Sequence, residues 1–371
     1  MSKLSIVVGA GFSAPAGYPT SELLNKRLME LQRGTLYYSL TGELKRHEGT
    51  LPQSFLTDVD LCIDLMHHFE RRMGSFYYKV FYDYLIEGAY KDESINEVID
   101  NKYYNKETIL YSLGAMRYIF KRLIDLCNYD NNGNYLYNSK DSFPKELFAP
   151  YEKFFVSLGE YESIDIYSLN DDLLADGLRF LDCIDGDFSD GFEYAQPAYK
   201  GEVWEGYGEV KEIVELPQYT GKFGKRVNLH KLRGSRDFYA LYKPLEYESF
   251  YGKEVFVKVD KKIDRISYNG VYLPFNYRGE FLSGMSVESI RRNYPIYCNL
   301  VMDNFRKSLE ESDKLMIIGY GGGDYDVNQQ IYKYFQSNKP SVVIDPNPSS
   351  RIVKMAVTLN SQVIRRPFEK L

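Results

Sequence analysis

The sequence predicts an α/β protein with a Rossmann-like, doubly wound parallel sheet, an inserted helical module and a small β-hairpin extension. Short apolar runs alternate with segments whose apolar residues recur at helical spacing, which is typical of strands joined by helices. Glycine-rich and Asn/Asp-containing motifs follow these runs, at the position where open parallel sheets bind ligands. The length of 371 residues suggests about two to three units.

The first predicted strand covers residues 4–9, and a glycine-rich turn follows it. A helix begins after this turn, with Thr20 or Ser21 as its candidate N-cap, because either side-chain oxygen can accept from the first helical turn. The later predicted strands are residues 164–168, 226–232, 314–319 and 341–345.

An inserted module is predicted after the first strand and helix. Apolar spacing is mostly helical over residues 55–126, and an Asn-rich stretch at 128–144 ends this region. A further amphipathic helix near 145–158 leads back to the sheet. The predicted boundaries are residues 1–24 and 159–371 for the Rossmann-like domain and residues 25–158 for the inserted helical module.

A β-hairpin is predicted within residues 253–273, where polarity alternates and an Asn269-Gly270 pair offers the turn. Residues 186–226 are rich in glycine, tyrosine and charge, so we expect loops with little regular structure there. The hairpin is therefore expected to be the main addition to the parallel sheet.

Charge and hydropathy exclude some classes of function. The chain has 46 Lys and Arg against 52 Asp and Glu, a formal net charge of −6. This balance argues against a basic duplex-binding surface, so direct nucleic-acid binding is not expected. The first apolar run is broken by glycines too early for a signal peptide or a membrane span, so no membrane association is expected and the expected location is the cytoplasm.

The four cysteines, Cys62, Cys127, Cys183 and Cys298, are separated by 65, 56 and 115 residues. No CxxC pair and no Cys/His cluster with the spacing of metal ligands exists in the sequence. We therefore expect neither a zinc site nor any other metal site, and no disulfide framework.

The turn Gly9-Ala10-Gly11-Phe12-Ser13 lies between a predicted strand and a predicted helix. Backbone N–H groups in such a turn can bind a phosphate, and glycine allows its close approach. A tight strand-to-helix turn that binds nothing explains the same residues equally well. The spacing is not GxGxxG, so the dinucleotide fingerprint of ordinary dehydrogenases is not matched.

Four blocks together resemble the sirtuin family. Gly9–Ser13 and the following Gly17-Tyr18-Pro19-Thr20 are similar to its GAGxS and GxP opening. Ser168–Leu174 resembles its T/S-x-N-x-D-x-L element, and Ile318–Asp324 with Asn328 resembles its GYS-x-x-D-x-x-x-N element. The remaining block, Asn228–Ser235, corresponds to the family's Lys-Leu-His-Gly-Ser. The blocks occur in the family's order between residue 6 and about residue 345.

The nearest subgroup is the sirtuin-like, NAD-cleaving proteins of bacterial antiphage defence, and the loop Asp190-Gly191-Phe192 also resembles that subgroup. The resemblance implies NAD as substrate, and it gives Asn170 the role of orienting a water, since its amide offers both a donor and an acceptor. Without the resemblance, Asn170 would be read as an Asx turn that caps the next helix.

Candidate nucleotide-binding residues lie in these blocks and after the last predicted strand. They are Gly9, Ala10, Gly11, Phe12, Ser13, Gly17, Pro19, Thr20, Asp172, Gly319, Tyr320, Gly321, Asp324, Asp345 and Asn347. Asp345 is a candidate because a carboxylate at a strand end is a common ribose partner, but a turn residue before Pro346 is an equal alternative.

Arg233 occupies the position of the family's catalytic histidine, although Lys231, Leu232, Gly234 and Ser235 match the block. Arginine stays protonated and cannot act as a general base. His230 is a weak substitute, because alternation along a strand points it away from the face shared by Lys231 and Arg233.

Three explanations of Arg233 remain open from the sequence. The first is that the chain is an engineered inactive variant. The second is that it is a natural pseudoenzyme that binds NAD or a related nucleotide. The third is that its largely dissociative reaction needs no strong base.

The resemblance implies an NAD glycohydrolase that depletes NAD as the effector of an antiphage system, releasing nicotinamide and ADP-ribose. The alternative is a non-catalytic subunit of a defence complex that binds NAD or ADP-ribose. A deacylase is disfavoured, because deacylating sirtuins carry a zinc module with two CxxC pairs and this chain has none. A homo-oligomer and a HerA-type hexameric ATPase are the partners that the resemblance implies.

Overall fold

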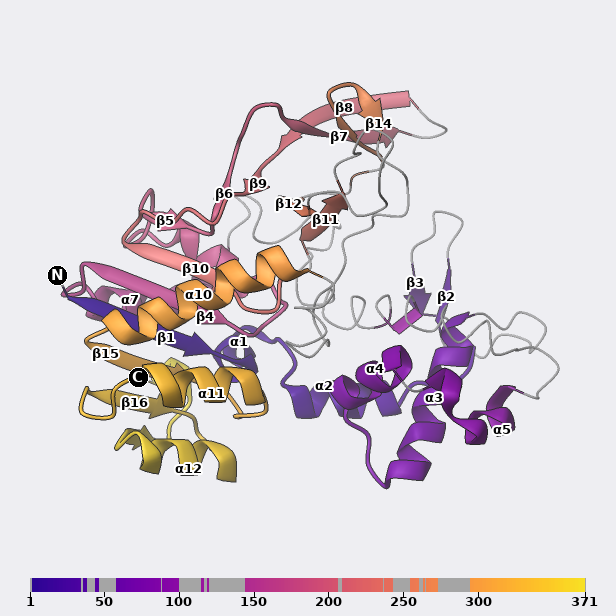
Figure 1. Cartoon of the computed structure of the whole chain (residues 1–371), viewed down its shortest axis with the longest axis horizontal. Helices are drawn as coiled ribbons and strands as arrows, with labels where there is room; N and C mark the ends of the chain where they lie inside the picture. Colours follow the sequence, from indigo (N-terminus) through magenta and orange to yellow (C-terminus); the bar gives the residue numbers. More distant parts are fainter. Residues whose placement is uncertain are drawn as a thin grey trace. The chain divides into compact units, whose positions relative to one another are not determined.

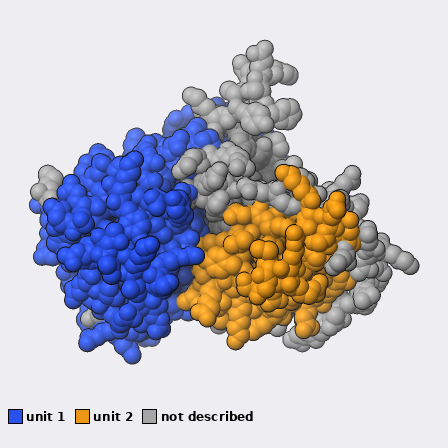
Figure 2. All heavy atoms as spheres, turned by 60° about the horizontal axis from the view of Figure 1, so that its bottom comes forward, with its two compact units in different colours: residues 1–18, 128–283, 287–371 blue, residues 19–127, 284–286 orange. Residues whose placement is uncertain are grey.

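The computed structural model describes residues 2–34, 36–38, 44–46, 58–87, 89–99, 115–116, 119, 144–205, 209–235, 237–242, 254–259, 263, 265–272 and 294–370. The chain divides into two compact units, which Figure 2 shows in different colours. Unit 1 comprises Met1–Tyr18, Asn128–Ser283 and Val287–Leu371, and unit 2 comprises Pro19–Cys127 and Gly284–Ser286.

A seven-stranded sheet forms the centre of unit 1 and confirms the predicted α/β class (Figure 1). Its strands, in spatial order, are β17 (Gln362–Ile364), β16 (Ser341–Ile344), β15 (Lys314–Ile318), β1 (Lys3–Val8), β4 (Ser163–Ser168), β10 (Val227–Lys231) and β5 (Phe188–Ser189). All neighbouring pairs are parallel. Parallel strands of this kind are buried on both faces, which explains the continuous apolar runs in the sequence.

The register of this sheet aligns the ends of its central strands. Val8 of β1 is opposite Ile318 of β15 on one side and Ser168 of β4 on the other. Ser168 is in turn opposite Lys231 of β10. The loops after four strands therefore begin side by side at one edge of the sheet, which is where the sequence motifs were predicted to meet.

Helical segments connect the strands of unit 1. They are α1 (Ala10–Ser13), η1 (Ala14–Ala16), α7 (Lys145–Ser157), α8 (Leu174–Gly177), η6 (Leu178–Phe180), α10 (Pro295–Glu311), α11 (Tyr325–Tyr334), α12 (Ser350–Thr358) and η7 (Phe368–Lys370). No helix in the described ranges is long and apolar enough to cross a membrane.

Helix α10 covers one face of the sheet. Ser308 of this helix hydrogen-bonds to Ser5 of β1 at 2.6 Å and to Asp165 of β4 at 2.8 Å. Tyr167, also of β4, donates its hydroxyl hydrogen to the backbone oxygen of Asn304 at 3.0 Å. Because side chains alternate along a strand, Ser168 and Ile166 face the other side of β4.

Unit 2 is mainly helical. It contains α2 (Ser21–Met29), α3 (Asp58–Met73), α4 (Tyr78–Glu87), η3 (Ala89–Lys91), η4 (Glu93–Ile95), α5 (Asn96–Ile99) and a two-stranded pair, β2 (Leu36–Tyr38) with β3 (Leu44–Arg46). Thr20 is the N-cap of α2, since its side chain accepts from the backbone N–H of Leu23. The aromatic rings of Phe69 and Phe81 pack at 5.5 Å within this unit.

The boundaries of the helical unit differ from the predicted 25–158. Helix α7 belongs to unit 1, because the Tyr151 ring packs edge-on against Phe12 at 5.0 Å and its hydroxyl donates to the Phe12 carbonyl at 2.6 Å. Helix α2 belongs instead to unit 2. The Asn-rich stretch predicted at 128–144 lies outside the described residues except for Pro144.

Two antiparallel sheets extend unit 1. One contains β11 (Phe238–Tyr242), β12 (Glu254–Lys258), β9 (Gln218–Tyr219) and β6 (Phe192–Glu193). The other contains β14 (Val271–Tyr272), β13 (Arg265–Tyr268), β7 (Tyr199–Glu205) and β8 (Glu209–Leu216). Buried residues of both sheets share one apolar core: Tyr199, Leu216, Leu241, Val257, Val259 and Ile266.

The predicted hairpin is confirmed as β13 and β14, which meet at Asn269 and Gly270 with φ values of 50° and 77°. The loop prediction for 186–226 is wrong, because strands β5 to β9 lie there. These strands are short or carry many charged residues, and they gain stability from pairing with distant strands such as β12 and β13. Their local sequence therefore gave little sign of strand structure.

Three glycines join the first turn to the end of β15. Gly11 donates its N–H to the Gly319 carbonyl at 3.0 Å, and Gly9 donates to the Ile318 carbonyl at 3.0 Å. A Cβ at Gly9 would lie 2.7 Å from the Gly319 oxygen, and a Cβ at Gly11 would lie 2.7 Å from the Gly319 Cα. Gly319 itself has φ of 58° and would clash with the Gly11 backbone if it carried a side chain. These glycines are thus required by backbone packing.

We expect Gly319→Ala to lower the free energy of unfolding by about 2 to 4 kcal/mol, because it combines a left-handed φ with a backbone clash. Gly321→Ala is the matched control, since a Cβ there meets no described atom within 4 Å. Urea denaturation of the two variants measures the difference. Equal losses in both would contradict the proposed packing role of Gly319.

Candidate functional site

The candidate site lies where β1, β4, β10 and β15 end, at the carboxyl edge of the sheet (Figure 1). It combines the Gly9–Ser13 turn, the segment Leu169–Leu174, the segment Leu232–Ser235 and the segment Gly319–Asp324. All four belong to unit 1, so their mutual geometry is defined. The sequence blocks that resemble one family are therefore brought together in space.

The Asn170 side chain is fixed by the first turn. Its Nδ2 donates to the Gly9 carbonyl at 2.9 Å and to Ser13 Oγ at 3.0 Å. Its backbone N–H donates to Ser168 Oγ at 3.2 Å. The side chain thus reaches across to β1 rather than capping its own loop, which removes the Asx-turn alternative.

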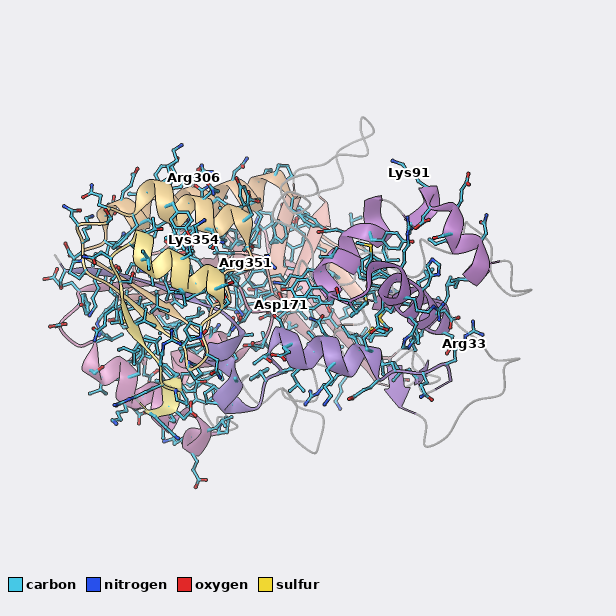
Figure 3. All side chains as sticks on the ribbon, turned by 90° about the horizontal axis from the view of Figure 1, so that it is seen from below. Arg33, Lys91, Asp171, Arg306, Arg351 and Lys354 are labelled. Atoms are coloured by element: carbon cyan, nitrogen blue, oxygen red, sulfur yellow. The ribbon has the colours of Figure 1, made fainter. Side chains whose placement is uncertain are left out.

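Asp172 completes a hydrogen-bonded chain with Ser13 and Asn170. Ser13 Oγ donates to Asp172 Oδ1 at 3.1 Å, and the N–H of Leu174 donates to the same oxygen at 3.1 Å. Burial raises the pKa of Asp172 to about 6, although Lys231 and these hydrogen bonds act in the opposite direction. This carboxyl therefore titrates near neutral pH at the edge of the sheet. Asp171, which separates it from Asn170, is labelled in Figure 3.

Lys231 at the end of β10 lies beneath the Asn170 segment. Its side chain is 1% exposed, and its Nζ donates to the Asp172 carbonyl at 2.5 Å and more weakly to the Asn170 carbonyl at 3.4 Å. The carboxylate of Asp176 lies 2.8 Å from the same nitrogen. The sequence matched Lys231 to a family block but gave it no role; the signal was a lysine within a buried strand.

Arg233 is paired with Asp324. Its Nε donates to Asp324 Oδ2 at 3.0 Å, and its Nη2 contacts the same oxygen, with both residues about 5% exposed. Asp324 Oδ1 also accepts from the N–H of Val327 at 3.2 Å and so caps α11. The residue at the expected histidine position therefore connects the end of β10 to the start of α11 as a buried cation.

The loop after β15 is shaped by its own side chains. The Tyr320 hydroxyl donates to Asn328 Oδ1 at 2.8 Å and accepts from the N–H of Asp324 at 3.1 Å. Asn328 Nδ2 donates to the Gly322 carbonyl at 2.9 Å, and Ser349 Oγ donates to the Gly321 carbonyl at 2.8 Å. Tyr320 is buried, so its side chain supports this loop instead of presenting a surface to a ligand.

The structure places His230 on the face of the sheet covered by α10, opposite the Lys231 side chain. Its ring stacks on Tyr167 at 4.5 Å and lies 3.9 Å from the Phe223 ring, and its Nε2 is 3.8 Å from Asp165. Burial lowers the pKa of His230, against the effect of Asp165. His230 therefore does not join Asn170 at the site, in agreement with strand alternation.

The other predicted binding residues have simpler roles in the structure. Asp345 Oδ1 accepts from the N–H of Asn347 at 2.8 Å, which is the turn alternative, and both residues remain accessible to solvent. Gly17 adopts φ of 87° at the end of η1. Pro19 and Thr20 belong to unit 2 and are not placed relative to the site. Across the described ranges, no group of three or more His, Cys, Asp or Glu side chains is arranged to hold a metal ion.

No protein-family model matches this sequence, and no curated protein matches it either. Among solved structures, a mutant Sir2 homologue in complex with ADP-ribose is similar at 10% identity and a TM-score of 0.33, over 99% of this chain and 88% of that one. A Sir2 homologue in complex with NAD is similar at 10% identity and a TM-score of 0.31, over 99% of this chain and 85% of that one. Likenesses this low say nothing of the function of this chain.

Titration of Asp172 is expected to change stability with pH. Its carboxyl has a pKa of about 6 in the folded chain against an ordinary value of 3.8, so the folded chain holds this proton more readily than the unfolded chain. The penalty for burying the charge is fully present above pH 6 and is relieved as pH falls toward 4, by on the order of 3 kcal/mol. As pH falls from 6 toward 4, the parent protein should therefore gain stability relative to the Asp172→Asn variant.

Chemical denaturation at a series of pH values measures this difference. Asp303→Asn changes an exposed carboxyl and is the matched control, for which the difference from the parent should stay small. A flat difference between the parent and Asp172→Asn would contradict the raised pKa of Asp172.

The Arg233–Asp324 pair is expected to show strong coupling. Arg233→Met should cost about 3 to 5 kcal/mol, because it leaves a buried carboxylate without its guanidinium. The double variant with Asp324→Asn should cost less than the sum of the two single variants, by about 1 to 3 kcal/mol. Urea denaturation of the four proteins measures this coupling, and additive losses would show that the pair contributes no net interaction.

Proposed function

We propose that this chain is a sirtuin-like NAD glycohydrolase that binds NAD at the carboxyl edge of its parallel sheet and hydrolyses the nicotinamide–ribose bond. The observation that carries the proposal is the Asn170 amide, held by the Gly9 carbonyl and Ser13 Oγ at the meeting point of all four blocks. A buried, oriented amide of this kind suits the positioning of a water or a ribose hydroxyl.

The proposed reaction places few demands on a general base. Nicotinamide leaves with the bonding electron pair, positive charge develops on the ribose, and water then bonds to the anomeric carbon and loses a proton. Asn170 orients the water, and Asp172, joined to Asn170 through Ser13, is a carboxylate that can accept the proton. Arg233 takes no proton in this scheme, because it remains charged against Asp324.

NAD would be held by backbone and side-chain groups of the Gly9–Ser13 turn and of the segments after β4 and β15. The glycines of the first turn pack against Gly319, so the space that a side chain would fill is taken by the protein backbone. They would support a nucleotide by fixing the conformation of the turn. A role as the NAD-depleting effector of an antiphage system, self-assembly and a HerA-type ATPase partner belong to this proposal through the sequence resemblance.

A non-catalytic subunit that binds NAD or ADP-ribose is the second candidate. Arg233 favours it, since the guanidinium stays protonated and cannot act as a general base at the position of the family's histidine. The two candidates share the same binding residues and differ in turnover.

Nicotinamide release from NAD tests the proposal, with and without a HerA-type ATPase. We expect Asn170→Ala to reduce release by about 100-fold, since it removes an oriented polar group. Asn299→Ala, an exposed position on α10, should leave it unchanged. Arg233→His and the Arg233→His, Asn170→Ala double variant show whether the arginine limits turnover.

Calorimetric titration with NAD separates the two candidates. Binding without release in every variant would exclude the hydrolase and support the binding subunit. Absence of both binding and release would exclude both candidates.

A further inference from the structure

A chain of buried and partly buried charges connects the candidate site to the antiparallel sheet that contains β12. Its members are three cations, Lys231, Lys258 and Arg179, and three carboxylates, Asp176, Asp190 and Asp237. They come from β10, β12, η6, α8 and the loops after β5 and β10. Lys231, Lys258, Asp176 and Asp237 are buried and require close partners, so the chain constrains the elements that contribute them.

Lys258 is the centre of this chain. Its Nζ lies 2.6 Å from Asp176 Oδ1, 2.7 Å from Asp190 Oδ2 and 3.4 Å from Asp237 Oδ2. Burial alone would lower the pKa of Lys258, but these carboxylates raise it above its ordinary value, so its ammonium group stays charged. Lys258 is the last residue of β12, so one strand of the antiparallel sheet is anchored beneath α8.

Asp176 links Lys258 to Lys231. Its Oδ2 lies 2.8 Å from Lys231 Nζ while its Oδ1 contacts Lys258, so one carboxylate bridges two lysines. Lys231 Nζ then donates to the carbonyls of Asp172 and Asn170. The Tyr297 hydroxyl donates to the Lys231 carbonyl and holds this residue from the α10 side.

We infer that Lys258, Asp176 and Lys231 are positioning residues, and that through them the antiparallel sheet holds the backbone of the segment that carries Asn170, whose amide the Gly9–Ser13 turn holds. The inference rests on the proposed function for its catalytic consequence, although the structural coupling stands without it. Lys231 donates to the carbonyls of Asn170 and Asp172, which belong to peptides 170–171 and 172–173, so it fixes the backbone on the C-terminal side of Asn170. Displacement of β12 would therefore be transmitted to Asn170 without any contact between β12 and a ligand.

Amide hydrogen exchange of the unliganded chain tests the coupling. We expect Lys258→Met to speed exchange within residues 168–175 by about 10-fold, a factor typical of coupled buried groups. Lys258→Arg keeps the charge and should restore slow exchange. Lys3→Met is the matched control, because Lys3 also pairs with carboxylates, Asp165 and Glu311, but on the α10 side of the sheet.

Asp190→Asn provides a milder variant if Lys258→Met does not fold. It removes one carboxylate partner of Lys258 and should speed exchange in residues 168–175 by a smaller factor. Unchanged exchange in a folded Lys258→Met or Asp190→Asn protein would overturn the inference. Equal acceleration throughout the parallel sheet, β15 included, would also overturn it, since that result indicates a general loss of stability.

Steady-state kinetics of nicotinamide release provide a second test of these positioning residues. We expect Lys258→Met to lower kcat by about 10-fold with little change in KM, because a positioning defect acts on the reacting geometry. If exchange responds but no variant binds or cleaves NAD, the proposed function fails and the coupling remains. If NAD is cleaved and neither exchange nor kcat responds to Lys258→Met, the inference fails and the proposed function remains.

Discussion

The contact between the backbones of Gly11 and Gly319 determines the geometry of the whole carboxyl edge. The Gly11 N–H donates to the Gly319 carbonyl, and neither position leaves room for a Cβ. Because the first turn is held in this way, the Gly9 carbonyl and Ser13 Oγ are fixed where the Asn170 amide meets them. A backbone contact between β1 and β15 thus sets the orientation of a side chain that follows β4.

Burial makes every other polar group of this edge depend on a partner. Asp172, Lys231 and Asp324 would each be costly to bury alone, and each is held by hydrogen bonds or opposite charges from another segment of the chain. The two faces of β10 show the same rule. Lys231 serves the carboxyl edge, whereas His230 is enclosed between Tyr167 and Phe223 near Asp165.

The parallel sheet, its strand ends and the separation of His230 from Lys231 were all predictable, because each follows from local periodicity. The Asp324 partner of Arg233 and the Lys258–Asp176 bridge were not, since they join residues 91 and 82 positions apart. The antiparallel strands of 186–226 were missed for a related reason. β7 pairs with β8 and β6 with β9 inside the segment, but β9 and β7 also pair with β12 and β13, which lie outside it and which the local sequence does not encode.

The charges around Asn170 explain how an arginine can occupy the histidine position without disrupting the edge. Asp324 neutralises the guanidinium and also caps α11, so one carboxylate satisfies both a cation and a helix N-terminus. The guanidinium itself stays protonated, so Arg233 takes no part in proton transfer. Any proton taken up at this edge near neutral pH is therefore expected on Asp172, whose burial raises its pKa to about 6 and whose hydrogen bond to Ser13 connects it to Asn170. The proposed hydrolysis thus depends on a carboxylate and an amide that the first turn of the chain holds together.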